Sequence, residues 1–146
     1  MTVKQALKYK NKLVSKMNDE FRRASQYNSV EEGVNRPYGA EVSLNNFINM
    51  SNELVELKTK IHLANVKVYD KIFLLSELKS RVSKLQMLDC SEGKVSDRYG
   101  RMTGEHPTFK TVEINILKKD EMIAELESKI EELQEALDVH NATTEI

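Results

Sequence analysis

The segment from Glu113 to His140 constrains the fold more than any other part of the chain, because it keeps an unbroken heptad spacing of three and four in which most of the positions are apolar. Such a repeat, kept over more than three heptads, is typical of a coiled-coil seam. A helix over 113–140 would be roughly 42 Å long at about 1.5 Å per residue, so its stripe needs an equally long partner. The residues that we expect to form the oligomer seam are Ile116, Ile123, Leu126, Ile130, Leu133 and Leu137.

Two polar residues, Lys119 and His140, occupy positions of the same repeat. A polar residue in a seam can fix the register of two helices, or it can mark the point where the seam opens into solvent. For His140, which stands at the end of the repeat, we expect the second role.

Three further segments, residues 2–27, 43–65 and 71–88, have the periodicity of amphipathic helices. Ser43 suits the N-cap of the second, and residues 66–69 either form a short extended break or continue the helix. Five Gly, two Pro and no Trp also favour long helices over sheets. The expected stripe of the first helix is Val3, Leu7, Val14, Met17, Phe21 and Ala24, with Lys10 at one seam position, and that of the second is Leu44, Phe47, Ile48, Leu54, Val55 and Ile61.

The pattern predicts a mainly all-α protein, an antiparallel helical bundle or coiled coil, in which residues 1–146 form a single domain. Residues 89–112, with three of the five glycines and Pro107, form a long loop between the last two helices. Within it, Lys94 to Met102 and Phe109 to Val112 suit a small β-hairpin. The loop also carries basic and aromatic residues suited to contact with a partner, namely Arg98, Tyr99, Arg101 and Lys110.

Charge is distributed unevenly along the chain. Between residues 2 and 27, seven basic residues stand against two acids, whereas between residues 113 and 140, nine acids stand against three lysines. The first and last helices are therefore complementary in charge and similar in length. We expect them to attract each other, within one chain or between copies.

Several short motifs resemble those of a bacterial family of unknown function, the DIP1984 family, some of whose members are labelled septicolysin. The similar segments, which together span most of the chain, are Asn28–Pro37 (NSVEEGVNRP), Leu57–Asn65 (LKTKIHLAN), Arg98 with Tyr99, and Thr111–Ile114 (TVEI). His62 and Ala64 stand where the family prefers Asn and Thr, and no Trp follows Asn141. The resemblance implies a helical, oligomeric protein without an established activity. The septicolysin label implies a membrane-active protein.

The candidates for chemistry are few. Glu105 and His106 pair a carboxylate with an imidazole, but a metal site needs three or four converging ligands, and an exposed turn explains the pair better. The single cysteine, Cys90, has no histidine near it in sequence to activate a thiolate. No phosphate-binding loop, nucleophile elbow or zinc-protease motif occurs. The sequence predicts no enzyme, no metal site and no cofactor.

Three functions remain open. The first is a structural or scaffolding protein that forms homo-oligomers through its helices. The second is a binding module, chaperone-like or associated with nucleic acid, that contacts a protein or other client through the 89–112 loop, although a net charge of −1 disfavours nucleic acid. The third is the membrane-active protein of the septicolysin label, although no apolar run has the length of a membrane span. The absence of a signal-peptide core predicts a cytoplasmic location.

Overall fold

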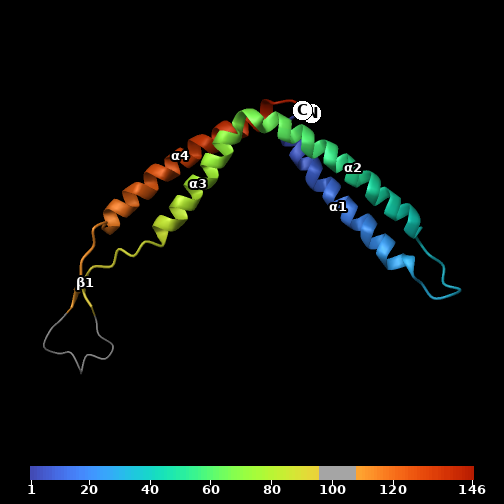
Figure 1. Ribbon diagram of the computed structural model, residues 1–146, viewed down its shortest axis with the longest axis horizontal. Helices are drawn as coiled ribbons and strands as arrows, with labels where there is room; N and C mark the ends of the chain where they lie inside the picture. Colours follow the sequence, from blue (N-terminus) through green and yellow to red (C-terminus); the bar gives the residue numbers. More distant parts are fainter. Residues whose placement is uncertain (96–107) are drawn as a thin grey trace, which may run out of the picture. The chain divides into compact units, whose positions relative to one another are not determined.

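The computed structural model describes residues 1–95 and 108–146. It confirms a mainly α-helical bundle with a loop before the last helix. The elements in order are α1 (Val3–Asn28), α2 (Ala40–Asn65), a 3₁₀ turn η1 (Val66–Val68), α3 (Tyr69–Gln86), the strands β1 (Gly93–Lys94) and β2 (Phe109–Lys110), and α4 (Ile116–Thr143) (Figure 1). They form two compact units: the first unit comprises Met1–Tyr69 and Leu137–Ile146, and the second unit comprises Asp70–Ala136.

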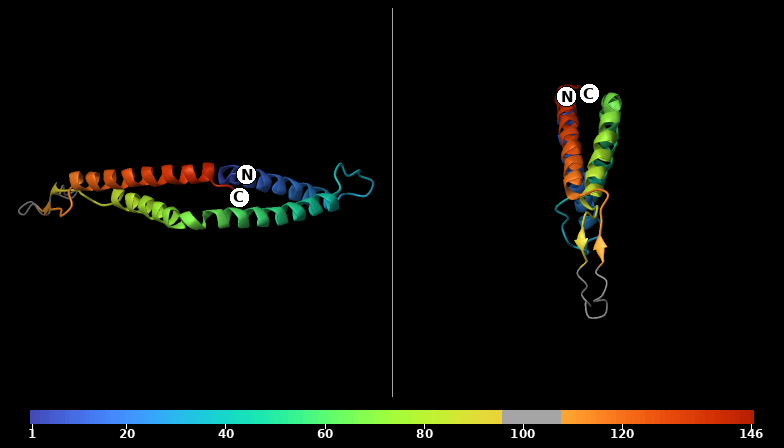
Figure 2. Two further views of the ribbon diagram at one scale, coloured as in Figure 1. Left: turned by 90° about the horizontal axis from the view of Figure 1, so that it is seen from above. Right: turned by 90° about the vertical axis from the view of Figure 1, so that its left-hand side faces the viewer.

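In the first unit, α1 and α2 lie side by side and antiparallel (Figures 1 and 2). Their buried residues recur at intervals of three, four, seven or eleven, as in a two-helix coiled coil. They are Val3, Ala6, Leu13, Met17 and Ala24 on α1, and Ser43, Leu54, Leu57 and Ile61 on α2. The helix that packs along α1 is thus α2, whereas the sequence had suggested the last helix.

The expected stripes of these two helices were partly wrong. On α1 the seam passes through Ala6 and Leu13, while Val14 and Phe21 are exposed; on α2, Leu44, Ile48 and Val55 are exposed. The seam of α1 includes the small Ala6 and the half-buried Lys10. In the sequence, the exposed apolar residues Val14 and Phe21 therefore looked more like seam residues than these two do.

Backbone hydrogen bonds join the two ends of the chain within the first unit. The Val3 N–H donates to the Thr144 carbonyl at 2.9 Å, and the Ile146 N–H donates to the Met1 carbonyl at 2.9 Å. Thr2 also caps α1, because its hydroxyl accepts the Gln5 N–H while the Gln5 side chain accepts the Thr2 N–H. Val3 is fully buried as a result.

The loop between α1 and α2 folds back on the end of α1. The Arg36 guanidinium donates to the carbonyls of Tyr27 and Asn28 at 2.8 and 3.1 Å, which satisfies two carbonyls that have no partner inside the helix. The Tyr38 ring lies 5.7 Å from the Tyr27 ring. Arg36 belongs to the Asn28–Pro37 motif, so this part of the motif has a structural role.

In the second unit, α3 and α4 run antiparallel and are joined by the strands (Figure 2). Within the described part of this unit, only Leu75, Leu78 and Val82 are buried, and all three lie on α3.

The hairpin is shorter than expected: Gly93 pairs with Lys110, and Lys94 pairs with Phe109. Residues 96–102 of the expected first strand lie outside the described residues.

Several element boundaries differ from the sequence prediction. The second helix begins at Ala40 with Gly39 as its N-cap, so Ser43 is a buried residue of the first turn and the prediction that it caps the helix was wrong. Residues 66–68 continue the helical path as a 3₁₀ turn into α3. The last helix begins and ends three residues later than predicted, over 116–143.

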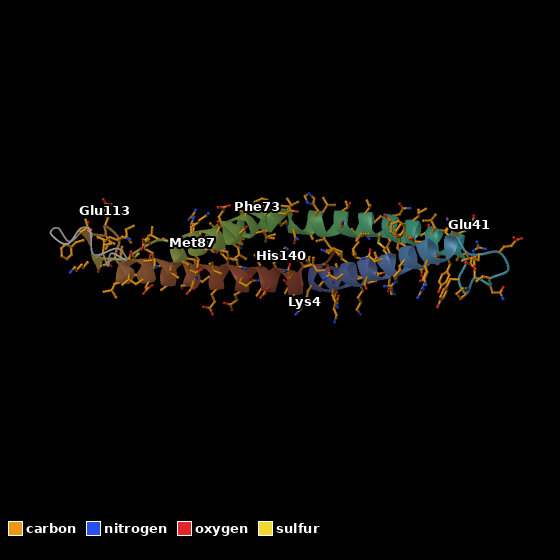
Figure 3. The ribbon with its side chains drawn as sticks, turned by 90° about the horizontal axis from the view of Figure 1, so that it is seen from below. Lys4, Glu41, Phe73, Met87, Glu113 and His140 are labelled. Carbon is orange, nitrogen blue, oxygen red and sulfur yellow. The ribbon has the colours of Figure 1, made fainter. Side chains whose placement is uncertain are left out.

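His140 does not mark a frayed end, contrary to our expectation. Its Nε2 lies 3.1 Å from the Asn65 side-chain oxygen and its Nδ1 lies 3.0 Å from the Thr144 hydroxyl. The half-buried ring therefore links the end of α4 to the end of α2 within the first unit. Figure 3 labels His140 on the last turns of α4 and Lys4 on the first turn of α1.

Candidate self-association site

The predicted seam of α4 is covered unevenly. Within the second unit, Ile123, Leu126, Ile130 and Leu133 are half-buried, and Ile116, the first residue of the helix, is 49% exposed. Leu137, which belongs to the first unit, is 7% exposed. Most of the stripe is thus only partly covered within the second unit.

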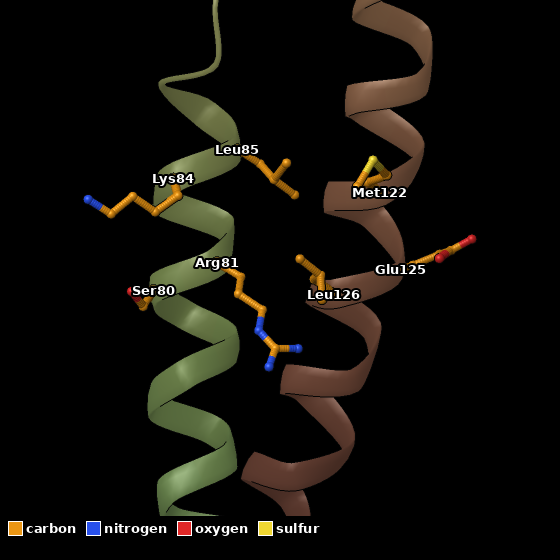
Figure 4. A pocket seen from close by; sticks show the side chains of 7 residues that line it. All are labelled: Ser80, Arg81, Lys84, Leu85, Met122, Glu125 and Leu126. Atoms are coloured by element: carbon orange, nitrogen blue, oxygen red, sulfur yellow. The ribbon is translucent and has the colours of Figure 1, made fainter. Parts of the chain in front are cut away.

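An apolar groove lies between α3 and α4 in the second unit, with a volume of about 450 Å³. The residues that line it are Ser80, Arg81, Lys84 and Leu85 from α3, and Met122, Glu125 and Leu126 from α4 (Figure 4). The close-up shows Leu85, Met122 and Leu126 pointing into the space between the helices, while Lys84 and Glu125 point away from it. The groove therefore has apolar walls and charged rims.

Arg81 gives the groove its polar component. Its side chain extends from α3 into the space between the helices (Figure 4), and among the described residues it forms no ion pair. A guanidinium can bind a carboxylate with two parallel hydrogen bonds. The groove is suited to a surface that presents apolar side chains together with an acidic group. The repeat in the sequence did not single out Arg81, although its place directly before Val82 on the α3 stripe was a signal for it.

The outer surface of α4 is strongly acidic. Within the described ranges, one ion pair on this helix joins Lys118 and Glu121 at 4.0 Å. Exposed glutamates without an ion pair in those ranges are Glu125, Glu127, Glu131, Glu132 and Glu135. This helix therefore offers both the apolar stripe and the carboxylates that the groove is suited to bind.

The lysines of α1 form the complementary surface. Lys4, Lys8, Lys12 and Lys16 are exposed, and in the part of the chain that the structure describes they take part in no ion pair. The two arginines near the end of α1 bind acids on the same helix, Asp19 and Glu20. The positive charge of the lysines remains available to a second molecule.

The loop residues proposed for partner contact are only partly described. Arg98, Tyr99 and Arg101, as well as Glu105 and His106, lie outside the described residues. Lys110 lies on β2, with its Nζ 3.9 Å from an Asp89 carboxylate oxygen. The other Asp89 oxygen accepts the Ser91 N–H at 2.9 Å and the Ser91 hydroxyl. These hydrogen bonds and the nearby lysines lower the pKa of Asp89 below that of an ordinary aspartate.

Lys119 occupies a seam position without burying its charge. Its Nζ donates to the Leu88 carbonyl at 3.2 Å, just beyond the end of α3, where the helix dipole favours a positive charge. The ammonium is thereby directed away from the apolar stripe. Lys119 thus links the start of α4 to the segment that directly follows α3.

The described residues show neither a cluster of metal ligands nor an activated nucleophile. Within residues 1–95 and 108–146, no group of three or more His, Cys, Asp or Glu side chains could hold a metal ion. Cys90 is a free, half-buried cysteine just after α3. In the same ranges, no helix is both long and apolar enough to cross a membrane.

The fold and its exposed seam define a helical bundle whose last helix is left partly uncovered. Comparison with known proteins adds no relative: no family model, no curated protein and no solved structure matches the chain.

Proposed function

We propose that this chain is a structural or scaffolding protein of the cytoplasm that assembles with copies of itself through the open side of the α4 seam. The observation that carries the proposal is the groove between α3 and α4, where Leu85, Met122 and Leu126 stay accessible beside Arg81. Apolar side chains arranged in a stripe and left in water favour association, because burying them releases roughly 25 cal/mol per Å². Membership of the DIP1984 family would agree with a helical oligomer.

A second copy is a suitable occupant of this groove. Its α4 carries apolar residues at seam spacing, and exposed glutamates stand beside them. When two copies meet about a twofold axis, α4 of each can lie against α3 of the other. Arg81 in the groove and Lys84 at its rim then lie opposite those glutamates.

The first test is the mass of the protein in solution over a range of concentrations. We expect the wild type to exceed the mass of one chain at micromolar concentration, and Leu126→Asp with Leu133→Asp to reduce both mass and helicity. Because these two residues are half-buried within one chain, Arg81→Ala serves as a second variant: its side chain is exposed, so the fold should persist while assembly weakens.

The control for the seam variants uses the same helix and the same change. Leu117→Asp with Val139→Asp places acids at positions that are 69% and 58% exposed, and it should leave the mass unchanged. A fully helical wild type with the mass of a single chain would overturn the proposal. The alternative of a binding module would then have to be examined through the 89–112 loop.

A further inference from the structure

Three exposed lysines follow one another along α1 at intervals of four residues. We name Lys4, Lys8 and Lys12 the lysine row. Residues four apart are neighbours on a helix, separated by about 6 Å along its axis. No acid stands three or four positions from any of the three, and among the described residues they form no ion pair. Like charges at this spacing destabilise a helix, so the lysine row destabilises α1 until an opposite charge approaches it.

The α4 helix carries a row of opposite charge with the same spacing. Its members are Glu127, Glu131 and Glu135, which are exposed and four residues apart, and we name them the glutamate row. No lysine stands three or four positions from any of them, and within the described ranges they form no ion pair. Each row therefore extends over roughly 12 Å, and the charges of the two rows can meet one to one.

The lysine row lies on the side of α1 that faces away from α2. Lys4 and Lys8 each precede a buried seam residue, Leu13 and Met17, by nine positions. Nine residues make two and a half turns, which places the two side chains of each pair on opposite sides of the helix. A partner can therefore contact the lysine row without disturbing the seam between α1 and α2.

The glutamate row lies on the side of α4 that faces away from the groove. Glu131 follows Met122 by nine positions, and Glu135 follows Leu126 by the same interval, so each glutamate stands opposite a residue that lines the groove. A copy that occupies the groove leaves this row accessible. The groove and the glutamate row can thus bind two different neighbours at the same time.

We infer that the lysine row of one copy binds the glutamate row of another. The equal spacing allows all three lysines to form ion pairs together. Two such rows run parallel to each other when their helices cross at about 50°, a common angle between packed helices. A second copy supplies both rows in equal number, whereas the net charge of −1 disfavours nucleic acid as the partner of the lysines.

This contact goes beyond the groove and rests on the proposed function in one respect, that copies associate through the groove. It joins two different surfaces, so it is a head-to-tail contact that adds copies until a ring closes or a filament forms. The groove alone, as a twofold contact, gives a dimer. We therefore expect a mass above two chains at low salt. It should fall to that of a dimer near 1 M salt, where the Debye length is about 3 Å.

The test reverses the charge of each row separately, in two triple variants. They are Lys4→Glu, Lys8→Glu and Lys12→Glu in the lysine row, and Glu127→Lys, Glu131→Lys and Glu135→Lys in the glutamate row. All six side chains are exposed, and both residue types are good helix formers, so circular dichroism should show wild-type helicity. Each variant alone should have the mass of a dimer at low salt. An equimolar mixture of the two should regain the wild-type mass, because each supplies the row that the other lacks.

The matched control changes the same number of exposed lysines outside the row. Lys58→Glu with Lys60→Glu and Lys67→Glu alters the net charge of the chain by the same amount, and it should keep the wild-type mass. If either row variant alone keeps the wild-type mass at low salt, or if the control loses mass equally, the inference is wrong.

The remaining outcomes separate this contact from its alternatives. If a chain with all six row changes regains the wild-type mass but the mixture of the two variants does not, the rows meet within one chain and the contact between copies is refuted. If the lysine-row variant keeps the wild-type mass but loses a binding to duplex DNA that the wild type shows, the row binds nucleic acid and the inference is also wrong. A wild-type dimer that Arg81→Ala dissociates and neither row variant alters would refute the row contact and leave the proposed function intact. A wild type with the mass of a single chain would refute both.

Discussion

Asp89 connects the end of α3 to the short hairpin through both of its carboxylate oxygens. One accepts two hydrogen bonds from Ser91, and the other lies near Lys110. All of these interactions favour the ionised form, which is why the pKa of Asp89 is lowered. The residue therefore makes the local structure of residues 89–94 sensitive to acid.

The sign of this dependence follows from the lowered pKa. The stabilisation by Asp89 is complete above the pKa of the unfolded residue, about 3.9, and is lost as the pH falls through the lower pKa of the folded state. We expect the chemical shift of the Ser91 amide proton, measured by NMR, to change below about pH 4, because protonation of Asp89 weakens the hydrogen bond that this amide donates. Asp89→Asn should remove this dependence, and a transition of that amide above pH 5 in the wild type would contradict the assignment.

Single residues also show what the sequence could not reveal. His140 has the spacing of a seam residue at the end of a repeat, which is equally compatible with fraying and with burial. Its partners, Asn65 and Thr144, are 75 and four positions away. Only the fold brings Asn65 close, so the role of His140 depends on a contact that periodicity cannot predict.

At the scale of elements, the sequence predicted the number and approximate bounds of the long helices, because each contains an amphipathic repeat. It did not predict which side of each repeat is buried. On α1, Val14 and Phe21 resemble core residues more than Lys10 and Ala6 do, yet Ala6 is buried in a cluster with residues of α2, whereas Val14 and Phe21 are exposed. The choice between two neighbouring stripes is made by the partner helix.

The seam of the first unit and the seam of α4 should respond differently to the loss of a side chain. Leu13 is 3% exposed and packs with Met17 and Leu54 in one chain, so Leu13→Ala should cost about 2 to 5 kcal/mol of unfolding free energy. That cost should be the same at every protein concentration.

Leu126→Ala removes contacts that we assign partly to a second copy. Its destabilisation should therefore grow as the protein becomes more concentrated and the wild type more fully assembled. Chemical denaturation of both variants at two concentrations, tenfold apart, measures the difference. Equal and concentration-independent losses for the two variants would argue against a shared α4 seam.

At the scale of the whole molecule, charge is separated between the basic α1 and the acidic α4. The sequence shows this separation, but it does not show which helices pack together. In the first unit, α1 packs against α2 and not against α4. The lysines of α1 and the glutamates of α4 are left exposed. We therefore expect their attraction to act between copies.

Such an attraction should be weak and sensitive to salt, because exposed ion pairs contribute only about 0.2 to 1 kcal/mol each. Raising the ionic strength from about 0.01 M to about 0.15 M shortens the Debye length from about 30 Å to about 8 Å. Over this range the dissociation constant measured by sedimentation should rise modestly, while the apolar groove keeps the assembly from separating completely. Lys8→Gln with Lys12→Gln should weaken assembly at low salt and flatten the salt dependence, since it removes exposed charge without altering the apolar groove. A wild-type assembly that becomes steadily tighter over the same range would mean that repulsion between like charges dominates, and that the complementarity of α1 and α4 is not used.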